Sequence, residues 1–233
     1  MDLEVVRAQL EEDLSWRAAE LRALRNELLG DIPEAGDWPA AALRALMVMQ
    51  YAHLEGFTQH ALGLYVEAVN DMALAAGELQ TRLFAAALAR EFKVLTAGAQ
   101  VNEDESSLLL RRAKRQVALI EKLLIGAREP IVIPVEDAIS LEMNLGADVL
   151  KRNLYLLGIP ESSLGGATYG TLEFIRRNRH DIAHGGRRER IEPRLFEAHW
   201  RRAEEYMSEL IRLLSRALRE GWYRRPPMSP ATS

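Results

Sequence analysis

Hydrophobic residues recur every three or four positions along most of the chain, which is the spacing of amphipathic helices. In the first stretch, leucines and other apolar residues keep this spacing until Gly30, a residue that commonly follows a helix end. Pro39 and Pro193 are placed as opening residues of later helices. The pattern predicts seven helices, over residues 3–28, 39–72, 79–95, 108–124, 145–157, 168–184 and 193–220.

The second of these helices is apolar on more than one face, which is typical of a helix at the centre of a bundle. Residues 126–143 break the helical pattern, and Pro130 and Pro134 indicate an extended linker laid over the core. No pair of strands is apparent. We therefore expect an all-α bundle with long antiparallel helices, forming a single domain over residues 1–223 with a disordered tail over residues 224–233.

The composition is that of a globular protein, with 48% hydrophobic and 27% charged residues. The absence of cysteine excludes disulfides, thiolate zinc sites, iron–sulfur clusters and cysteine nucleophiles. No apolar run is long enough to cross a membrane, and the first residues lack the basic front of a secretory signal. These features predict a cytoplasmic protein without membrane contact.

Charge is unevenly distributed along the chain. The net charge is −4, yet residues 175–225 contain 14 arginines against 8 acidic residues. A basic segment suits an acidic partner such as RNA, but a solvated helix face explains the charge more simply. Charge alone favours the solvated face.

Two histidines, His180 and His184, lie near the predicted end of the sixth helix, and Gly185 follows at the left-handed position just past that end. A basic helix terminus that complements the helix dipole explains the neighbouring arginines, but neither the histidine pair nor Asp181. A metal site is a second interpretation, since the histidines are four residues apart. It lacks a third ligand near by, and the arginines repel a cation. We expect no metal and no cofactor.

Phosphodiester chemistry is the third interpretation, and it uses both residue types. A neutral imidazole exchanges a proton near physiological pH, and a guanidinium binds a phosphate and its transition state. Because RNA supplies its own nucleophile, the 2′-OH, this reaction needs few protein groups.

The segment resembles the signature of the HEPN superfamily, which is an Arg, a spacer of four to six residues and a His. Its residues here are Arg179-His180-Asp181-Ile182-Ala183-His184-Gly185. Three further segments resemble the MAE-type HEPN nucleases, which are related to RiboL-PSP-HEPN proteins, in the order of that family. They are Leu14-Ser15-Trp16-Arg17, the stretch from Tyr51 through His53 and Glu55 to Phe57, and Asn144-Leu145 with Leu154-Tyr155-Leu156-Leu157-Gly158.

The resemblance implies a helical bundle that dimerises, with the Arg–His motifs of two protomers meeting at the interface. It implies a metal-independent endoribonuclease that leaves a 2′,3′-cyclic phosphate end. Proteins of this kind act as toxins in toxin–antitoxin or defence loci, so a cognate antitoxin is an expected partner. The alternatives are a non-catalytic HEPN bundle that binds a nucleotide or a partner protein, and a plain helical interaction protein.

By the same resemblance, His184 is the acid–base residue, Arg179 holds the scissile phosphate, and His180 orients or assists. Arg177 also satisfies the motif with a longer spacer, and on an ideal helix it shares a face with His184 whereas Arg179 does not. The family register favours Arg179. The flanking residues expected to contact RNA are Arg176, Arg177 and Asn178, and those expected to support the site structurally are Tyr51 and Glu55.

Overall fold

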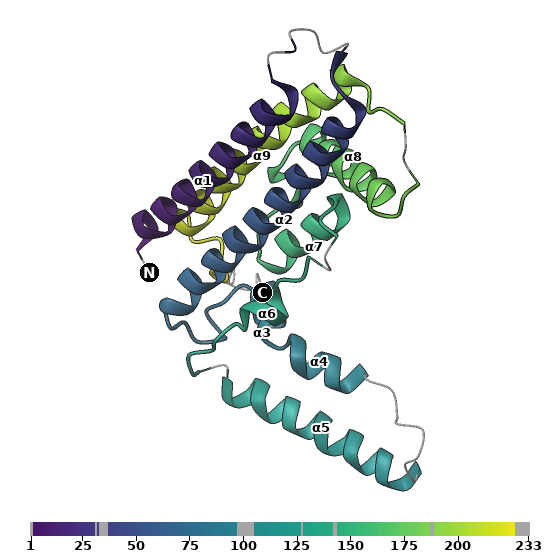
Figure 1. Ribbon diagram of the computed structural model, residues 1–233. Coiled ribbons are helices and arrows are strands. Elements are labelled where there is room, and N and C mark those ends of the chain that lie inside the picture. Colours follow the sequence, from purple (N-terminus) through teal and green to yellow (C-terminus); the bar gives the residue numbers. More distant parts are fainter. Residues whose placement is uncertain are drawn as a thin grey trace.

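Three long helices lie side by side in the computed structural model: α1 (Leu3–Leu29), α2 (Ala40–Asp71) and α9 (Pro193–Arg219) (Figure 1). Helix α1 runs antiparallel to the other two. The structure describes residues 2–30, 32, 37–96, 105–126, 128–141, 144–186 and 189–226. Within these ranges the regular structure is helical, apart from two isolated β-bridges, so the predicted all-α bundle is confirmed.

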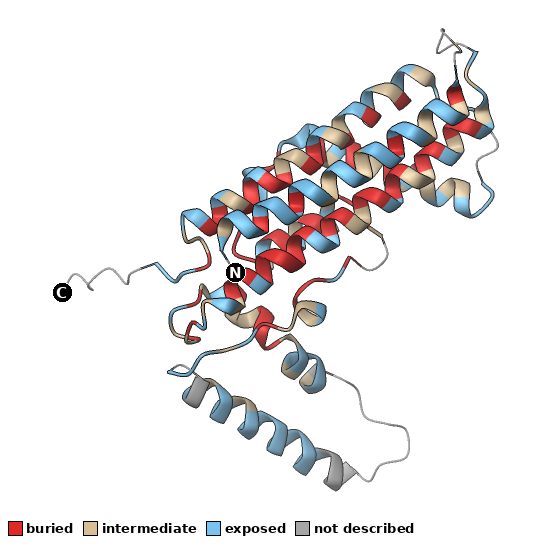
Figure 2. Cartoon of the chain, turned by 60° about the vertical axis from the view of Figure 1, so that its left-hand side comes forward, coloured by how far each residue is buried: buried red, intermediate tan, exposed pale blue. Residues whose placement is uncertain are grey.

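Helix α2 is the centre of the bundle, as its apolar residues predict. It packs against α1, α9 and α8 (Gly166–Ala183), and more than half of its residues are buried. Figure 2 shows the buried positions gathered on the facing sides of the long helices. Burying this much apolar surface is the main term that stabilises such a bundle.

Helix α8 carries the histidine pair, and it is held on two sides. It packs against α2 and α9, and α7 (Ala147–Leu156) contacts it near its start. A short 3-10 turn, Glu161–Ser163, joins α7 to α8. Helix α9 begins where the sequence predicts, with Pro193 in its first turn and the Glu192 carboxylate accepting the N–H groups of Arg194 and Leu195.

The described residues form nine α-helices rather than seven. The predicted third helix divides at Leu88 into α3 (Thr81–Ala87) and α4 (Ala89–Thr96). The linker contains the four-residue helix α6 (Val135–Ala138). The linker otherwise lies on the core as expected, because Ile133, Ile139 and Leu141 are buried.

Helices α4 and α5 (Glu105–Gly126) form a hairpin that projects from the bundle (Figure 1). At the C-terminal end, the Arg225 N–H donates to the Glu78 carbonyl, so paired backbone continues into the predicted tail. Residues 227–233 of that tail lie outside the described residues. No helix in the described part of the chain is both long and apolar enough to span a membrane.

Candidate active site

The histidine pair lies where α8 ends. His184 follows the last helical residue, and its N–H donates to the His180 carbonyl at 3.0 Å. Gly185 has a φ of +70°, the left-handed conformation predicted for it. The local fold therefore stops the helix immediately after His184 and leaves its side chain at the edge of the bundle.

His180 and His184 form an exposed pair of rings. Their centroids are 4.4 Å apart, with the ring planes inclined by 52°. Arg177 is also exposed. At helical spacings of three and seven residues, it lies on the same face as the two histidines. One face of α8 thus presents a guanidinium and two imidazoles to solvent.

Arg179 is directed to a different side of α8. Its guanidinium lies 4.4 Å from the centroid of the Tyr51 ring on α2, and the side chain is half-buried. His184 is five positions after Arg179 and directly follows the last helical residue, so ideal helix geometry would start the two side chains about 140° apart around the helix axis. The motif arginine is thus held against Tyr51 of α2, whereas the motif histidine is exposed at the end of α8.

Tyr51 links Arg179 to the loop before α7. Its hydroxyl donates to Glu55 Oε1 at 2.8 Å and accepts the Leu145 N–H at 2.6 Å. Burial, and next the hydrogen bond to Glu55, raise the pKa of Tyr51 well above its usual value, so the hydroxyl stays protonated. The two residues expected to support the site thus act together: Tyr51 contacts Arg179, and Glu55 accepts the hydrogen bond of the Tyr51 hydroxyl.

The other predicted RNA contacts differ in exposure. Arg176 is half-buried and forms an ion pair with Glu173. Asn178 is only 3% exposed, and its Nδ2 donates to the Phe174 carbonyl at 2.8 Å. In the protomer, then, Arg177 is exposed to solvent, Arg176 is half-buried, and Asn178 is withdrawn into the packing of α8.

A groove of about 570 Å³ between α8 and α9 is lined by Arg177 from α8 and His199 from α9. No role was predicted for His199 from the sequence. The His199 ring stacks on Phe174 at 3.9 Å, and its Nδ1 lies 3.0 Å from Thr171 Oγ1. Burial lowers the pKa of His199. Its partners come from another helix, so no local sequence pattern reveals them.

The Trp-Arg segment of α1 packs on the middle of α2, which joins two of the segments singled out in the sequence. The Arg17 guanidinium reaches the His53 carbonyl at 3.4 Å, and the Trp16 ring lies 5.5 Å from that of His53. A Cβ at Gly56 would lie 2.9 Å from Arg17 Nη1. These residues position α1 on α2 and take no direct part in the histidine face.

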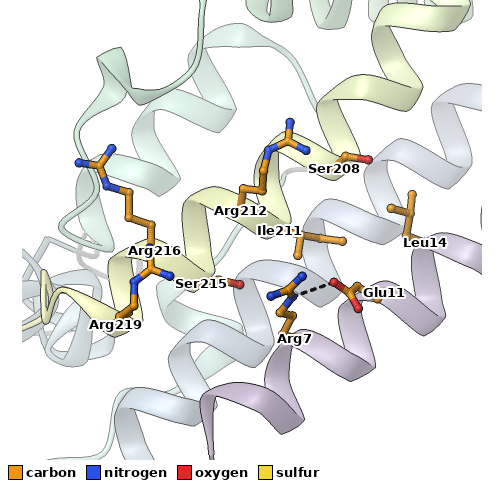
Figure 3. A pocket seen from close by; sticks show the side chains of 9 residues that line it. All are labelled: Arg7, Glu11, Leu14, Ser208, Ile211, Arg212, Ser215, Arg216 and Arg219. Atoms are coloured by element: carbon orange, nitrogen blue, oxygen red, sulfur yellow. Dashed lines mark hydrogen bonds and ion pairs between the residues drawn. The ribbon is translucent and has the colours of Figure 1, made fainter.

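A second basic groove, of about 580 Å³, lies between α1 and α9, and no α8 residue lines it (Figure 3). Several arginines of the arginine-rich segment, residues 175–225, line this groove. The Arg7 guanidinium, which pairs with Glu11 at 2.7 Å, lines it from α1. The α9 residues that line it are Ser208, Ile211, Arg212, Ser215, Arg216 and Arg219.

No metal-binding group of three or more His, Asp or Glu side chains is present among the residues that the structure describes. The His180–His184 pair has no third protein ligand there. His53, on α2, is 5% exposed and has Nε2 3.1 Å from Glu20 Oε2 on α1.

Comparison with protein-family models supports the resemblance noted in the sequence. The model of the MAE_28990-like HEPN family matches residues 6–223, which is nearly the whole chain. No curated protein and no solved structure gives a significant match. The chain therefore belongs to the MAE_28990-like HEPN family.

Proposed function

We propose that this HEPN protein is a metal-independent endoribonuclease whose active site forms around the C-terminal end of α8. The observation that carries the proposal is the exposed pair of imidazoles, 4.4 Å apart, on a helix that also presents Arg177 and Arg179. A proton-transfer pair beside guanidinium groups is the minimal set for cleaving RNA through its 2′-OH. The HEPN family includes ribonucleases, which agrees with this chemistry.

In the proposed reaction, one imidazole takes the proton of the ribose 2′-OH as O2′ forms a bond to phosphorus. The P–O5′ bond breaks, and a protonated imidazole gives its proton to the leaving 5′-oxygen. The products are a 2′,3′-cyclic phosphate and a 5′-hydroxyl. His184 is the principal acid–base group and His180 assists it, while Arg179 stabilises the extra negative charge on the phosphorane.

Two chains complete the site in this proposal. Arg179 is held against Tyr51 of α2 while His184 is exposed at the end of α8, so we propose that the two groups that act on one phosphate come from different chains. A two-fold dimer that joins the α8 ends brings the arginine of one protomer to the histidine of the other, and it forms two equivalent sites. The Tyr51 ring keeps the Arg179 guanidinium in a fixed orientation for that approach.

RNA binding in this arrangement uses Arg177 first, because it is the most exposed of the predicted contacts. Arg176 contributes charge from its ion pair with Glu173, and Asn178 positions the helix from within. We further propose that the protein acts in the cytoplasm as the toxin of a toxin–antitoxin or defence system, with a protein antitoxin that covers the α8 end.

The experiment is RNA cleavage by the purified protein in the presence of EDTA, with analysis of the product ends. The wild type is compared with His184→Ala and with His60→Ala, a matched loss of an exposed histidine on α2. We expect cleavage by the wild type and by His60→Ala, with cyclic phosphate ends, and none by His184→Ala.

Three results would overturn the proposal. A requirement for added metal would exclude the mechanism, and equal cleavage by His184→Ala would exclude the site. If a folded wild type cleaves none of several RNAs yet binds a mononucleotide, the non-catalytic HEPN alternative replaces the nuclease.

A further inference from the structure

The α4–α5 hairpin carries most of the exposed apolar surface in the described part of the chain. Seven of the twelve large hydrophobic side chains that are exposed there belong to α4 or α5. In Figure 2 the described positions along α5 are coloured almost throughout as exposed. A concentration of this kind on one projecting element marks an interaction surface rather than scattered surface residues.

One face of α5 is already occupied by α4. The Arg115 guanidinium donates to the Val94 carbonyl at 3.3 Å, and Lys122 pairs with Glu91. Leu119 lines the same shallow pocket between the two helices. Arg115 and Lys122 of α5 are therefore directed toward α4.

The opposite face of α5 carries an apolar stripe with no partner in the described chain. Its members are spaced by three, four, three and four residues, which is the a/d repeat of a coiled coil. At 100° per residue, the stripe lies roughly 170° around the helix from the face that contacts α4. We call it the α5 stripe, and it consists of Leu110 (58% exposed), Ala113, Val117 (53%), Ile120 (55%) and Leu124 (73%).

We propose that the α5 stripe binds the α5 stripe of a second copy of this chain, in an antiparallel coiled coil. Antiparallel helices pair each a position with a d position, so Val117 packs on the partner's Ile120 and Ala113 on the partner's Leu124. This proposal does not depend on the proposed nuclease. It adds a second two-fold interface, remote from the α8 end.

Charges beside the stripe fit this occupant. The e positions are Lys114 and Glu121, both exposed. In an antiparallel pair the e positions of the two helices face each other, so Lys114 meets the partner's Glu121, and the reverse pair forms as well. A parallel pair would instead place e beside g, and the g positions are uncharged: Leu109, Gln116 and Leu123.

A lipid surface fits the same face less well. An amphipathic helix that lies on a membrane has cations on both borders of its apolar face. On α5, one border mixes Lys114 with Glu121 and the other has no charge, while Arg115 and Lys122 are directed to α4. This distribution of charge is that of a helix that packs against another helix.

Disulfide trapping tests the pairing, because the natural chain contains no cysteine. Ala113→Cys and Leu124→Cys proteins are mixed and treated with a mild oxidant. The antiparallel pair predicts a cross-linked dimer in the mixture and none in either protein alone. A parallel pair would place residue 113 against residue 113 of the partner and would cross-link Ala113→Cys with itself. In the antiparallel pair these two positions are about 16 Å apart along the helix. Arg112→Cys, on the α4 side, is the control and should not react with itself.

A charge exchange gives a second, independent readout. Lys114→Glu and Glu121→Lys each turn both interchain charge pairs into like-charge pairs, so each should weaken self-association by about tenfold. An equimolar mixture of the two variants restores opposite charges in both pairs and should restore association. Sedimentation velocity measures both, and circular dichroism confirms that each variant is folded. Cross-linking of Ala113→Cys alone, or no cross-linking in any mixture, would overturn the proposal, and neither outcome bears on RNA cleavage.

Discussion

The guanidinium of Arg179 lies 4.4 Å over the ring of Tyr51, and the hydroxyl of that ring is bonded to both Glu55 and the Leu145 backbone. The arginine is therefore tied, through one aromatic side chain, to the middle of α2 and to the loop that precedes α7. Such support fixes the direction of a flexible side chain, and a fixed charge stabilises a transition state without reorganising during the reaction.

Two substitutions of Tyr51 distinguish the contribution of the ring from that of the hydroxyl. Tyr51→Phe keeps the ring under Arg179 and loses two hydrogen bonds, so we expect a stability loss of about 1–2 kcal/mol with cleavage nearly unchanged. Tyr51→Leu also removes the cation–π contact, and cleavage should fall about tenfold. Urea unfolding and single-turnover cleavage measure the two effects. Equal cleavage by both variants would show that the ring does not position Arg179.

Arg177 and Arg179 should have different kinetic roles, because one is open to solvent and the other is held against Tyr51. Arg179→Ala should lower the single-turnover rate about a hundredfold. Arg177→Ala should raise the RNA concentration needed for half-maximal rate several-fold, with the maximal rate unchanged. The opposite pattern would make Arg177 the motif arginine.

Stability should decrease in mild acid because of one buried histidine, His53, and one half-buried histidine, His199. Burial lowers the pKa of both His53 and His199 in the folded chain. The unfolded chain therefore takes up these protons first, so stability is lost as the pH falls from about 7 through the unfolded value near 6.5. The loss ends below the folded pKa values.

Urea midpoints between pH 7.5 and pH 5.5 measure this effect. A protein with both His53→Gln and His199→Gln should show a smaller decrease across that range than the wild type. His60→Gln, at an exposed position on α2, is the control and should follow the wild type. An unchanged slope in the double variant would contradict the assignment.

Gly56 and Arg17 should be energetically coupled. A Cβ at Gly56 would lie 2.9 Å from Arg17 Nη1 and displace that side chain from Asp13 and from the His53 carbonyl. In an Arg17→Ala background, Gly56→Ala should stabilise the protein by about 0.5–1 kcal/mol, the usual gain within a helix. In the wild type that gain should be offset. A double-mutant cycle from urea unfolding gives the coupling, and additive effects would refute it.

The sequence predicts the bundle well because helical periodicity is a local signal. The central place of α2, the end of α1 near Gly30 and the left-handed Gly185 all follow from it. The division at Leu88 and the short α6 do not, because they depend on how the linker and α3 pack rather than on the apolar pattern.

The site was predictable only in part, for the same reason. The motif places His180, His184 and Arg179 on one helix, and ideal helix geometry already separates Arg179 from His184. The partner of Arg179, the burial of Asn178 and the place of His199 come from contacts with α2, α7 and α9. Contacts between distant segments leave no trace in local spacing.

Cleavage by dimers of defined composition tests whether Arg179 and His184 of two chains share one RNA-cleaving site. Chains with two different tags are co-expressed, and mixed dimers are purified. A dimer of Arg179→Ala with His184→Ala retains one intact shared site, so it should cleave at about half the wild-type rate.

The control is a mixed dimer of the wild type with the chain that carries both substitutions. It has no intact shared site and should be inactive. The reverse result, an inactive first dimer and a half-active second one, would place Arg179 and His184 of a single chain in each site and contradict the shared arrangement.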